Sequence, residues 1–455
     1  MSRLNPPARP DAAASPAALT ALPATLDHLR VITVAAPVVA LDVAYALWPR
    51  DEALMWDPPA GPGAAATGTA VCLHATGARR MTDIMQASAR VWRALEAAET
   101  LDGPRPRLWG GFAFAPGAAA GAPWEEFGDA AFVLPRITYW RDGDRAWLQG
   151  AAMGREDALR SELESARAAL TRAAAQGEPP ATAAVPEYSI APVDRESWRR
   201  QVDSILESIA AGRAQKVVAA RCARVTFARA PSVVRALANL RDETGGVWRF
   251  AFTRGGTTFL GATPEMLVAR HGMTVESEAL AGTLDKSAGP GGDLIARGKD
   301  RSEHEFVRQG IVNELAPLCA KLAVPAVPAV RELRQMFHLS SPIRGQLSAP
   351  LHVLELGERL HPTPATGGTP RAVAVESILA TETTPRGWYG APVGWFDATG
   401  DGELVVALRS GLVAGHEAHI YAGAGIVAGS RADDELDETR LKQRVLLRAL
   451  GIDAS

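Results

Sequence analysis

Four carboxylates in this chain occur as two pairs with helical spacing. Asp300 and Glu303 lie three residues apart, and so do Glu435 and Glu438. Residues three apart project from one face of a helix, so each pair would present two carboxylates together. Two such helices that converge would form an oxygen-rich site for a hard divalent cation such as Mg²⁺, with water and substrate as further ligands. The simpler alternative is that both pairs are solvated helix N-termini stabilised by the helix dipole.

The residues that follow Glu303 favour a functional role for it. Apolar residues recur after it at helical spacing, namely Phe306, Val307, Gly310, Ile311, Leu315 and Leu318. Glu303 therefore lies on the stripe that should face the interior. A carboxylate there is costly unless something compensates its charge.

The segment 421–450 predicts a strand, a glycine turn and an acidic helix. Gly423, Gly425 and Gly429 would let an anionic small molecule approach bare backbone amides. Ser430 and Asp433 match a capping box, which predicts a helix from there through residue 450.

That helix would place Lys442 on the same face as Glu435 and Glu438, four residues after Glu438. Only five lysines accompany 43 arginines in the chain. Where arginine is the usual cation, a lysine is the better candidate for giving up a proton.

Two further groups are candidates for proton transfer. Lys216 begins a predicted strand and shares a face with Val218, Ala220 and Cys222. Loss of solvation there would favour the neutral amine and make Lys216 a general base, unless its ammonium group reaches solvent from a strand end. Glu265 follows Gly and Pro at a strand boundary, and is either an exposed turn residue or a general acid that points into a cleft.

Composition excludes several classes of protein. The net charge of -3 and the pI near 6.3 give no basic patch for nucleic acid. No apolar run reaches the roughly 18 residues that span a bilayer. The three cysteines, Cys72, Cys222 and Cys319, are scattered and odd in number. They argue against a disulfide framework and for a reducing compartment, so we expect the cytoplasm.

Other binding motifs fail on spacing. Gly423-x-Gly-x-x-x-Gly imitates a dinucleotide fingerprint, but the few residues after Gly429 leave no room for the returning strand. Gly298-Lys299 lacks the remaining residues of a phosphate-binding loop. The absence of His-Glu-x-x-His and of paired Cys-x-x-Cys makes a zinc site improbable.

The remaining pattern alternates strands and helices. Residues 1–27 predict a disordered Ala/Pro-rich tail, and 176–186 predict a connector with a possible boundary near residue 187. Strands are expected within 31–34, 38–43, 108–114, 389–395 and 404–410, where Arg409 would suit a carboxylate. A meander is expected over 249–280, with turns at Gly255-Gly256 and His271-Gly272. Helices are expected over 81–99, 156–175 and 198–209, and from near Pro370.

Taken together, these motifs resemble the chorismate-utilising enzymes, which include anthranilate synthase component I, and most closely the isochorismate synthases. The resemblance is strong over 195–450 and rests on motifs that occur in the expected order. They are Lys216-Val-Val-Ala, Gly261-Ala-Thr-Pro-Glu, Ala281-Gly-Thr, Glu303-His, His338-Leu, Leu360-His-Pro-Thr-Pro-Ala, Ala407-Leu-Arg and Tyr421-Ala-Gly-Ala-Gly-Ile-Val with Glu435-x-x-Glu-Thr-x-x-x-Lys442.

The resemblance implies an α/β (α+β) fold, with one large domain of two layered, mainly antiparallel sheets flanked by helices. Residues 28–186 would be the N-terminal half of this domain, and 187–452 its catalytic region. The connector would then lie inside the domain. We expect a monomer.

The resemblance also implies a role for each residue. Lys216 would activate water, and Glu265 would protonate the departing 4-hydroxyl. Glu303 and Glu438 would bind Mg²⁺, supported by Asp300 and Glu435. The substrate would be bound by Thr283, Gly282, His338, Ala365, Tyr389, Arg409, Gly423, Gly425 and Lys442.

The implied reaction is conversion of chorismate to isochorismate, which would supply a siderophore or a quinone. In ammonia-using relatives a threonine resembles the counterpart of Ala365, so alanine here favours water. Thr366 departs from the aliphatic residue usual in isochorismate synthases. No glutamine amidotransferase subunit is expected. The alternatives are a salicylate synthase, a binding-only relative and a nucleotide-dependent oxidoreductase.

Overall fold

A computed structural model of the protein describes residues 29–48, 51–95, 103–176, 185–286, 289–296, 298–334 and 336–453. The predicted tail over 1–27 and most of the predicted connector, 177–184, lie outside these ranges. Within them, every strand pairing is antiparallel. The strand pairings form two series that share β5, and we call these series the first sheet and the second sheet.

The first sheet runs in the order β1-β6-β5-β3-β2-β9-β10-β19-β20-β8, and β7 and β16 continue it beyond β8. Its strands are β1 (Leu29–Ala35), β2 (Glu52–Asp57), β3 (Gly63–Ala75), β5 (Ala130–Asp142), β6 (Arg145–Met153), β7 (Tyr188–Ile190), β8 (Lys216–Phe227), β9 (Trp248–Arg254), β10 (Thr257–Thr263), β16 (Gly368–Thr369), β19 (Ser410–Ala414) and β20 (Glu417–Ile426).

The second sheet starts on the same β5 and runs in the order β4-β17-β18-β11-β12-β15, with β13 and β14 beside β15. Its strands are β4 (Leu108–Phe112), β11 (Met266–His271), β12 (Thr274–Asp285), β13 (Cys319–Ala323), β14 (Ala329–Glu332), β15 (Met336–Leu347), β17 (Pro392–Phe396) and β18 (Gly402–Val406).

An aromatic core joins the two sheets. One buried cluster combines Trp56, Phe250 and Phe259 of the first sheet with Trp109 and Trp395 of the second. Gly110 in β4 allows tight backbone contact there, because an added Cβ would lie 1.8 Å from the carbonyl oxygen of Ala131. The strand expected within 108–114 is present as β4, which is buried along its whole length.

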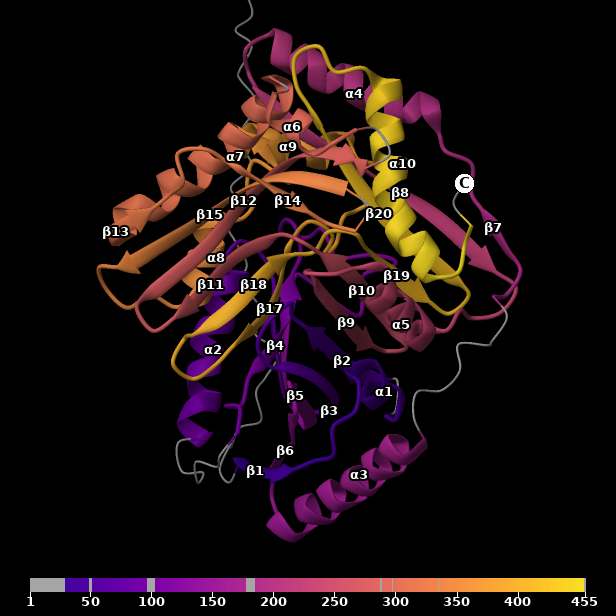
Figure 1. Ribbon diagram of the computed structural model, residues 1–455, viewed down its shortest axis with the longest axis vertical. Coiled ribbons are helices and arrows are strands. Elements are labelled where there is room, and N and C mark those ends of the chain that lie inside the picture. Colours follow the sequence, from indigo (N-terminus) through magenta and orange to yellow (C-terminus); the bar gives the residue numbers. More distant parts are fainter. Residues whose placement is uncertain are drawn as a thin grey trace, which may run out of the picture.

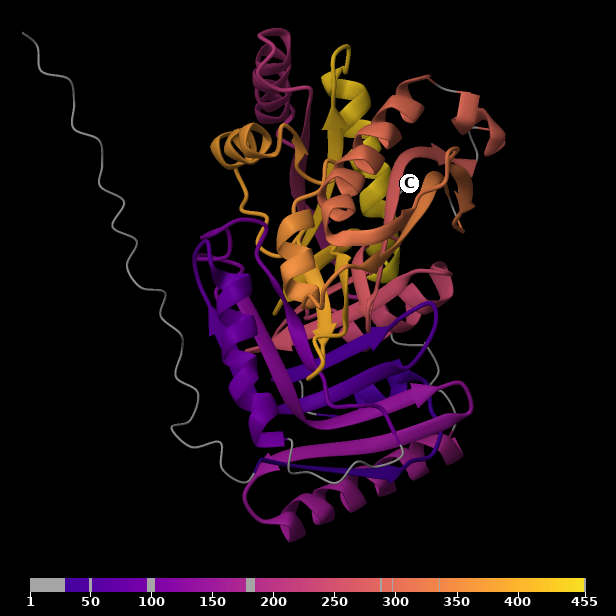
Figure 2. The same cartoon turned by 90° about the vertical axis from the view of Figure 1, so that its left-hand side faces the viewer.

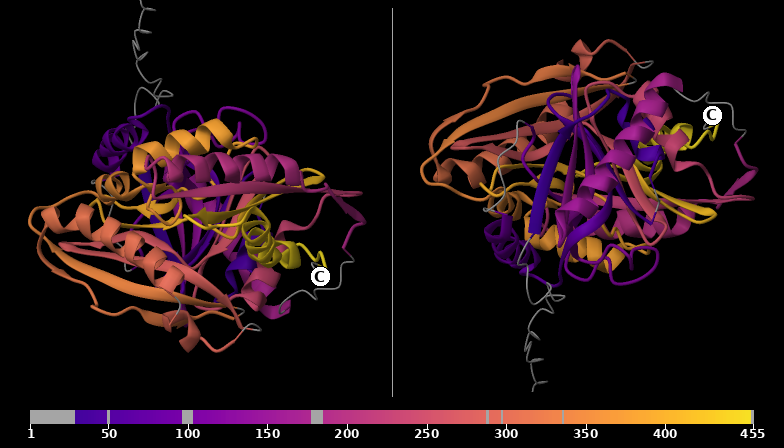
Figure 3. Two further views of the ribbon diagram at one scale, coloured as in Figure 1. Left: turned by 90° about the horizontal axis from the view of Figure 1, so that it is seen from above. Right: turned by 90° about the horizontal axis from the view of Figure 1, so that it is seen from below.

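Helices cover the outer faces of both sheets. Buried apolar side chains of α1, α3, α5 and α10 pack against the first sheet in one hydrophobic cluster. Those of α2, α7 and α8 pack against the second sheet in another. Viewed as in Figure 1, α4, α7, α9 and α10 gather at one end of the molecule, and β1–β6 with α3 occupy the opposite end. Figure 2 shows the same division from the side. The left view of Figure 3 shows α4, α7, α9 and α10 from above, at the end where they gather. The helices are α1 (Leu41–Ala46), α2 (Arg80–Leu95), α3 (Glu156–Gln176), α4 (Arg195–Ala210), α5 (Val233–Glu243), α6 (Gly292–Ala296), α7 (Gly298–Leu315), the 3-10 helix η2 (Ala316–Leu318), α8 (Val353–Leu360), α9 (Arg371–Thr381) and α10 (Ala432–Ala449).

Strands from both sides of residue 187 pair directly. β2 pairs with β9, and β4 pairs with β17. The N-terminal half therefore contributes to the same two sheets as the rest of the chain. Among the described residues, no helix is both long and apolar enough to cross a membrane.

The structure corrects two predicted strands. The run 38–43 does not form a strand, because Leu41–Ala46 folds as α1 and buries Leu41, Ala44 and Tyr45 on one face. The run 404–410 is broken between β18 and β19. The helix predicted near Pro370 is present, with Pro370 as its N-cap.

Candidate active site

Two of the places where the chain passes between the two sheets are neighbours. β10 belongs to the first sheet and β11 to the second, so the predicted meander changes sheet at Pro264-Glu265. The chain passes back between β18 and β19, where Arg409 has a φ of 49°. The backbone N–H of Val406 donates to the carbonyl oxygen of Glu265 at 3.0 Å, which ties the two crossings together. Glu265 and Arg409 thus reach one place from remote parts of the sequence.

A pocket opens beside these crossings, and its lining includes side chains of α7 and α10. Figure 1 shows both helices at the same end of the molecule. The pocket contains about 730 Å³ of space free of protein atoms, its open mouth included. Its lining comes from both sheets and both helices. The lining residues are Pro264, Glu265, Leu280, Ala281, Gly282, Asp300, Glu303, His338, Ala365, Leu408, Arg409, Gly425, Glu438 and Lys442.

Lys216 lies at the start of β8 with its side chain completely buried. Its Nζ donates to Oε1 of Glu303 at 2.8 Å, and Glu303 lines the pocket. A Cβ on Gly425 of β20 would lie 2.8 Å from Lys216 Cε and 3.0 Å from Glu303 Oε1. The solvent-exposed alternative for Lys216 is therefore wrong. Gly425 leaves the space that this ion pair occupies.

A second ion pair lies on the α10 side of the pocket. Lys442 Nζ donates to Glu438 Oε1 at 2.6 Å and to the carbonyl oxygen of Gly423 at 2.9 Å. The predicted placement of Glu438 and Lys442 on one helix face is confirmed. Glu435 belongs to the same helix but is buried and is not among the lining residues.

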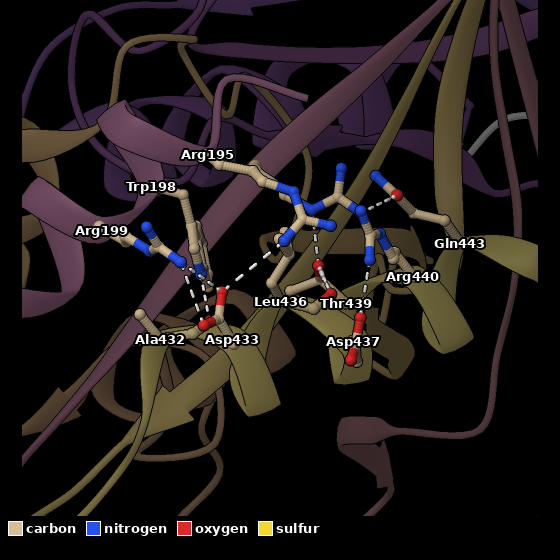
Figure 4. A network of polar contacts seen from close by, with 11 residues as sticks. Arg195, Trp198, Arg199, Ala432, Asp433, Leu436, Asp437, Thr439, Arg440 and Gln443 are labelled. Carbon is tan, nitrogen blue, oxygen red and sulfur yellow. Dashed lines mark hydrogen bonds and ion pairs between the residues drawn. The ribbon is translucent and has the colours of Figure 1, made fainter. Parts of the chain in front are cut away.

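Contacts from α4 hold the start of α10 in place (Figure 4). Asp433 accepts from Arg199 at 3.1 Å, and Trp198 Nε1 donates to the carbonyl oxygen of Ala432 at 2.7 Å. The predicted capping box is wrong, because the Ser430 hydroxyl accepts from the backbone N–H of Val427 and the helix begins at residue 432. Gly423 and Gly425 lie within β20, not in the predicted turn.

Burial changes the protonation of Glu265. Its side chain lies in the interior, and this desolvation raises its pKa to about 8, although Lys216 acts in the opposite direction. Glu265 is therefore protonated at neutral pH, as a general acid must be. The exposed-turn alternative for Glu265 is wrong.

His338 is held next to a bulge in β12. Gly282 has a φ of 72° at the register shift between β12 and β15, and its carbonyl oxygen lies 2.9 Å from His338 Nδ1. Burial lowers the pKa of His338 to about 3, so its ring is neutral. A Cβ on Gly282 would approach Asp300 to 3.2 Å, so this glycine lets α7 lie close to β12.

Tyr389 is not among the lining residues. Its ring stacks on Tyr421 with the centroids 5.3 Å apart, and burial raises its pKa to about 12. A Cβ on Gly423 would lie 3.3 Å from the Tyr389 hydroxyl.

The chain matches the family described as "Chorismate binding enzyme" over residues 24–451. This protein is a member of the chorismate-binding enzyme family. A relative from Pseudomonas aeruginosa, named salicylate biosynthesis isochorismate synthase, is 35% identical over 399 residues, which are 85% of this chain and 82% of that protein. Isochorismate synthase MenF of Bacillus subtilis is 34% identical over 356 residues, which are 76% of this chain and 75% of that protein.

Solved structures of chorismate-binding enzymes agree with this assignment. The menaquinone-specific isochorismate synthase of Escherichia coli matches with a TM-score of 0.76 at 26% identity, over 93% of this chain and 95% of that one. Anthranilate synthase component I of Streptococcus pneumoniae, at 18% identity and a TM-score of 0.66, covers 88% of this chain and 92% of its own, and shows the shared fold. The predicted family and fold class are confirmed.

Most of the predicted site residues of this chorismate-binding enzyme come together. Ten line the pocket, namely Glu265, Gly282, Asp300, Glu303, His338, Ala365, Arg409, Gly425, Glu438 and Lys442. Lys216 contacts the lining residue Glu303, whereas Gly423, Tyr389 and Glu435 are not among the lining residues. The side chain of Thr283 is outside the described part of the structure. Four more residues line the pocket without having been predicted as site residues, namely Pro264, Leu280, Ala281 and Leu408. Leu280 precedes a quoted motif, and the other three belong to one.

The donor groups fit a magnesium ion that keeps part of its water shell. Within the described ranges, no three His, Cys, Asp or Glu side chains are grouped closely enough to form a ready-made metal site. Asp300, Glu303 and Glu438 nevertheless line one pocket. Mg²⁺ commonly binds through one or two carboxylates, with water and substrate oxygens as the other ligands. Two carboxylates on facing helices therefore suffice, and the larger predicted set, which includes Glu435, is not assembled.

Proposed function

We propose that this protein is an isochorismate synthase, which converts chorismate to isochorismate by adding water at C2 and losing the C4 hydroxyl. The observation that carries the proposal is the placement of a buried amine and a buried, protonated carboxyl group at one carboxylate-bearing pocket. Relatives that are named isochorismate synthases and match most of the chain support the same activity.

Lys216 and Glu265 supply the two proton transfers. The reaction needs a base to take a proton from the attacking water and an acid to give one to the departing hydroxyl. Glu265 holds the required proton at neutral pH. The Lys216 ammonium group is paired with Glu303, and its base form requires that it release its proton and this contact.

Glu303 and Glu438 are the groups that we assign to Mg²⁺, with Asp300 beside them. When bound, the ion would neutralise a substrate carboxylate and fix its position. Each of the two glutamates already contacts a lysine ammonium group, at 2.8 and 2.6 Å.

Arg409 and Lys442 are suited to the second carboxylate of chorismate. The Arg409 side chain is partly buried and lines the pocket, with Nη2 3.2 Å from the sulfur of Met336. An arginine can bind a carboxylate through two parallel hydrogen bonds. Substrate held at both carboxylates would have a fixed orientation between acid and base, which favours reaction.

The test is incubation of the purified protein with chorismate and Mg²⁺, followed by chromatography of the products. We expect isochorismate as the product, and no conversion when Mg²⁺ is chelated. Fluorescent salicylate formed without a second enzyme would instead identify a salicylate synthase, the alternative that Thr366 leaves open. Chorismate binding without any product would contradict an enzymatic role.

A further inference from the structure

The strand that carries Lys216 has a gap along one edge. On its other edge, β8 pairs with β20 from Val217 to Thr226. On the gapped edge, β16 pairs only with Lys216 and Val217, and β7 pairs only with 225–227. Buried backbone groups at such a gap require other hydrogen-bond partners.

Two side chains at and beyond the end of α9 bind backbone groups of β8 within this gap. Glu382 Oε1 accepts from the backbone N–H of Ala220 at 2.9 Å, and Arg386 Nη2 donates to the carbonyl oxygen of Val218 at 2.7 Å. The two side chains also bind each other, with Arg386 Nε 2.9 Å from Glu382 Oε2 and Nη2 2.6 Å from Oε1. The pair therefore provides the hydrogen bonds that an adjacent strand would provide, two to four residues after Lys216.

The same guanidinium group also reaches the pocket wall opposite. Arg386 Nη1 donates to the carbonyl oxygen of Thr366 at 2.8 Å, and Thr366 follows the lining residue Ala365. The guanidinium lies on the Phe114 ring, 4.3 Å from its centroid. Arg386 thus connects the strand of Lys216 to the segment of Ala365 in a fixed geometry.

The ion pair of Arg386 and Glu382 is almost completely buried, and a gain in folding stability does not by itself account for a buried ion pair. The Arg386 and Glu382 side chains are 3% and 6% exposed. Burial raises the pKa of Glu382, and Arg386 opposes that shift. Desolvating two charges often offsets their attraction, and apolar residues can replace such pairs without loss of stability. What apolar residues cannot replace is the set of directed bonds to Val218, Ala220 and Thr366.

We propose that Glu382 and Arg386 are positioning residues for the reaction, which set the place of Lys216 relative to the wall at Ala365. This inference rests on the proposed function, because it concerns the base of that reaction. Neither residue lines the pocket. Their effect should therefore appear in the rate of the bound substrate's reaction and not in substrate affinity.

The kinetic test compares Arg386→Lys with a matched control, Arg270→Lys. Arg270 is similarly buried and also contacts a backbone carbonyl oxygen, that of Thr399 at 2.5 Å, and a carboxylate, that of Asp401 at 3.1 Å, but these partners lie between β17 and β18 and not on β8. Lysine keeps the charge of Arg386 and cannot make its three directed contacts at once. We expect kcat to fall about 10- to 100-fold in Arg386→Lys, as for a misplacement of about 1 Å, with KM within about threefold. The control should keep its kcat.

A second measurement does not depend on turnover. The chain has only five lysines, so protein labelled with ¹³C at lysine Cε gives few NMR signals, and that of Lys216 is identified by its absence in Lys216→Arg. We expect this signal to shift in Arg386→Lys and to stay in place in Arg270→Lys. If the wild type made no isochorismate, the proposed function would fail, and the NMR comparison would still decide the positioning role.

The results separate positioning from stability. Glu382→Gln keeps an oxygen for the Ala220 amide and is judged by the same two criteria if Arg386→Lys does not fold. An unmoved Lys216 signal, an unchanged kcat, or an equal loss in the control would overturn the proposal. It would also be overturned if both Arg386→Lys and Glu382→Gln failed to fold while Arg270→Lys folded, because the pair would then serve stability.

Discussion

Glu265 and Lys216 are both buried beside the same pocket, but their charges are compensated in different ways. Glu265 is neutral because desolvation raises its pKa to about 8. Lys216 has a carboxylate partner, Glu303, at 2.8 Å. An uncompensated buried charge is costly, and the structure avoids it in two ways, by protonation and by pairing. Protonation gives the acid that the proposed reaction needs, whereas Lys216 must first release its proton and its contact with Glu303 to act as the base.

Replacing Glu265 should reduce activity and increase stability. We expect Glu265→Gln to lose roughly 10²- to 10⁴-fold in kcat, the usual contribution of a general acid. The folded-state pKa of about 8 lies above the ordinary value of 4.5, so the wild type loses stability as pH rises from 4.5 to 8. Glutamine does not titrate. The difference in free energy of unfolding between Glu265→Gln and the wild type should therefore grow in favour of the variant over that window and level off above it.

That advantage should reach a few kcal/mol at most, since one pKa unit corresponds to about 1.4 kcal/mol. Urea unfolding of both proteins at pH 5, 7 and 8.5 measures it. A variant that is less stable than the wild type at all three pH values would show that Glu265 is not held as a neutral acid. The same acid predicts that wild-type kcat declines above about pH 8.

At the scale of elements, β20 must pass close to the ion pair of Lys216 and Glu303. We predict that Gly425→Ala reduces kcat at least tenfold, because the added Cβ would lie 2.8 Å from Lys216 Cε and 3.0 Å from Glu303 Oε1. The contacted atoms are ends of side chains that can move, so the melting temperature should change little. Gly121→Ala, with no atom within 4 Å of the added Cβ, is the control. Full activity in Gly425→Ala would contradict the tight packing of the site.

The convergence of α7 and α10 predicts a metal effect. In Glu438→Gln, the amide is a poorer ligand for Mg²⁺, so we expect the Mg²⁺ concentration for half-maximal activity to rise at least tenfold. Glu305→Gln on the exposed side of α7 is a control for loss of one carboxylate, since Glu305 pairs with Arg308 there. An unchanged magnesium titration in Glu438→Gln would remove its role as a ligand.

Helical spacing predicted these two elements well, and local capping chemistry did not. The spacing of Asp300, Glu303, Glu438 and Lys442 needs only the helix period, and all four line the pocket. The Ser430 capping box failed because the Ser430 hydroxyl binds the turn before the helix, a choice between two nearby amides that sequence alone does not determine.

At the scale of the whole molecule, the site depends on two sheets that share β5 and on two neighbouring places where the chain crosses between them. The crossings at Glu265 and Arg409 are about 140 residues apart in sequence and are joined by backbone hydrogen bonds. Local patterns could predict the individual strands. They could not predict that the chain would pass from one sheet to the other within the expected meander, 249–280, and within the expected strand, 404–410. These changes of sheet depend on pairing with strands that are distant in sequence. The family resemblance supplied the two-sheet arrangement, and the edge contacts of Glu382 and Arg386 with β8 had no local signal.

The origin of the new hydroxyl oxygen tests the central claim most directly. The account requires solvent water to attack C2 while the original 4-hydroxyl leaves, with Lys216 as the base. Chorismate converted by the protein in H₂¹⁸O with Mg²⁺ should give isochorismate that carries one ¹⁸O atom, detected as a mass increase of about 2 Da, and Lys216→Ala should give no labelled product. Unlabelled isochorismate, or labelled product formed at the wild-type rate by Lys216→Ala, would contradict the account.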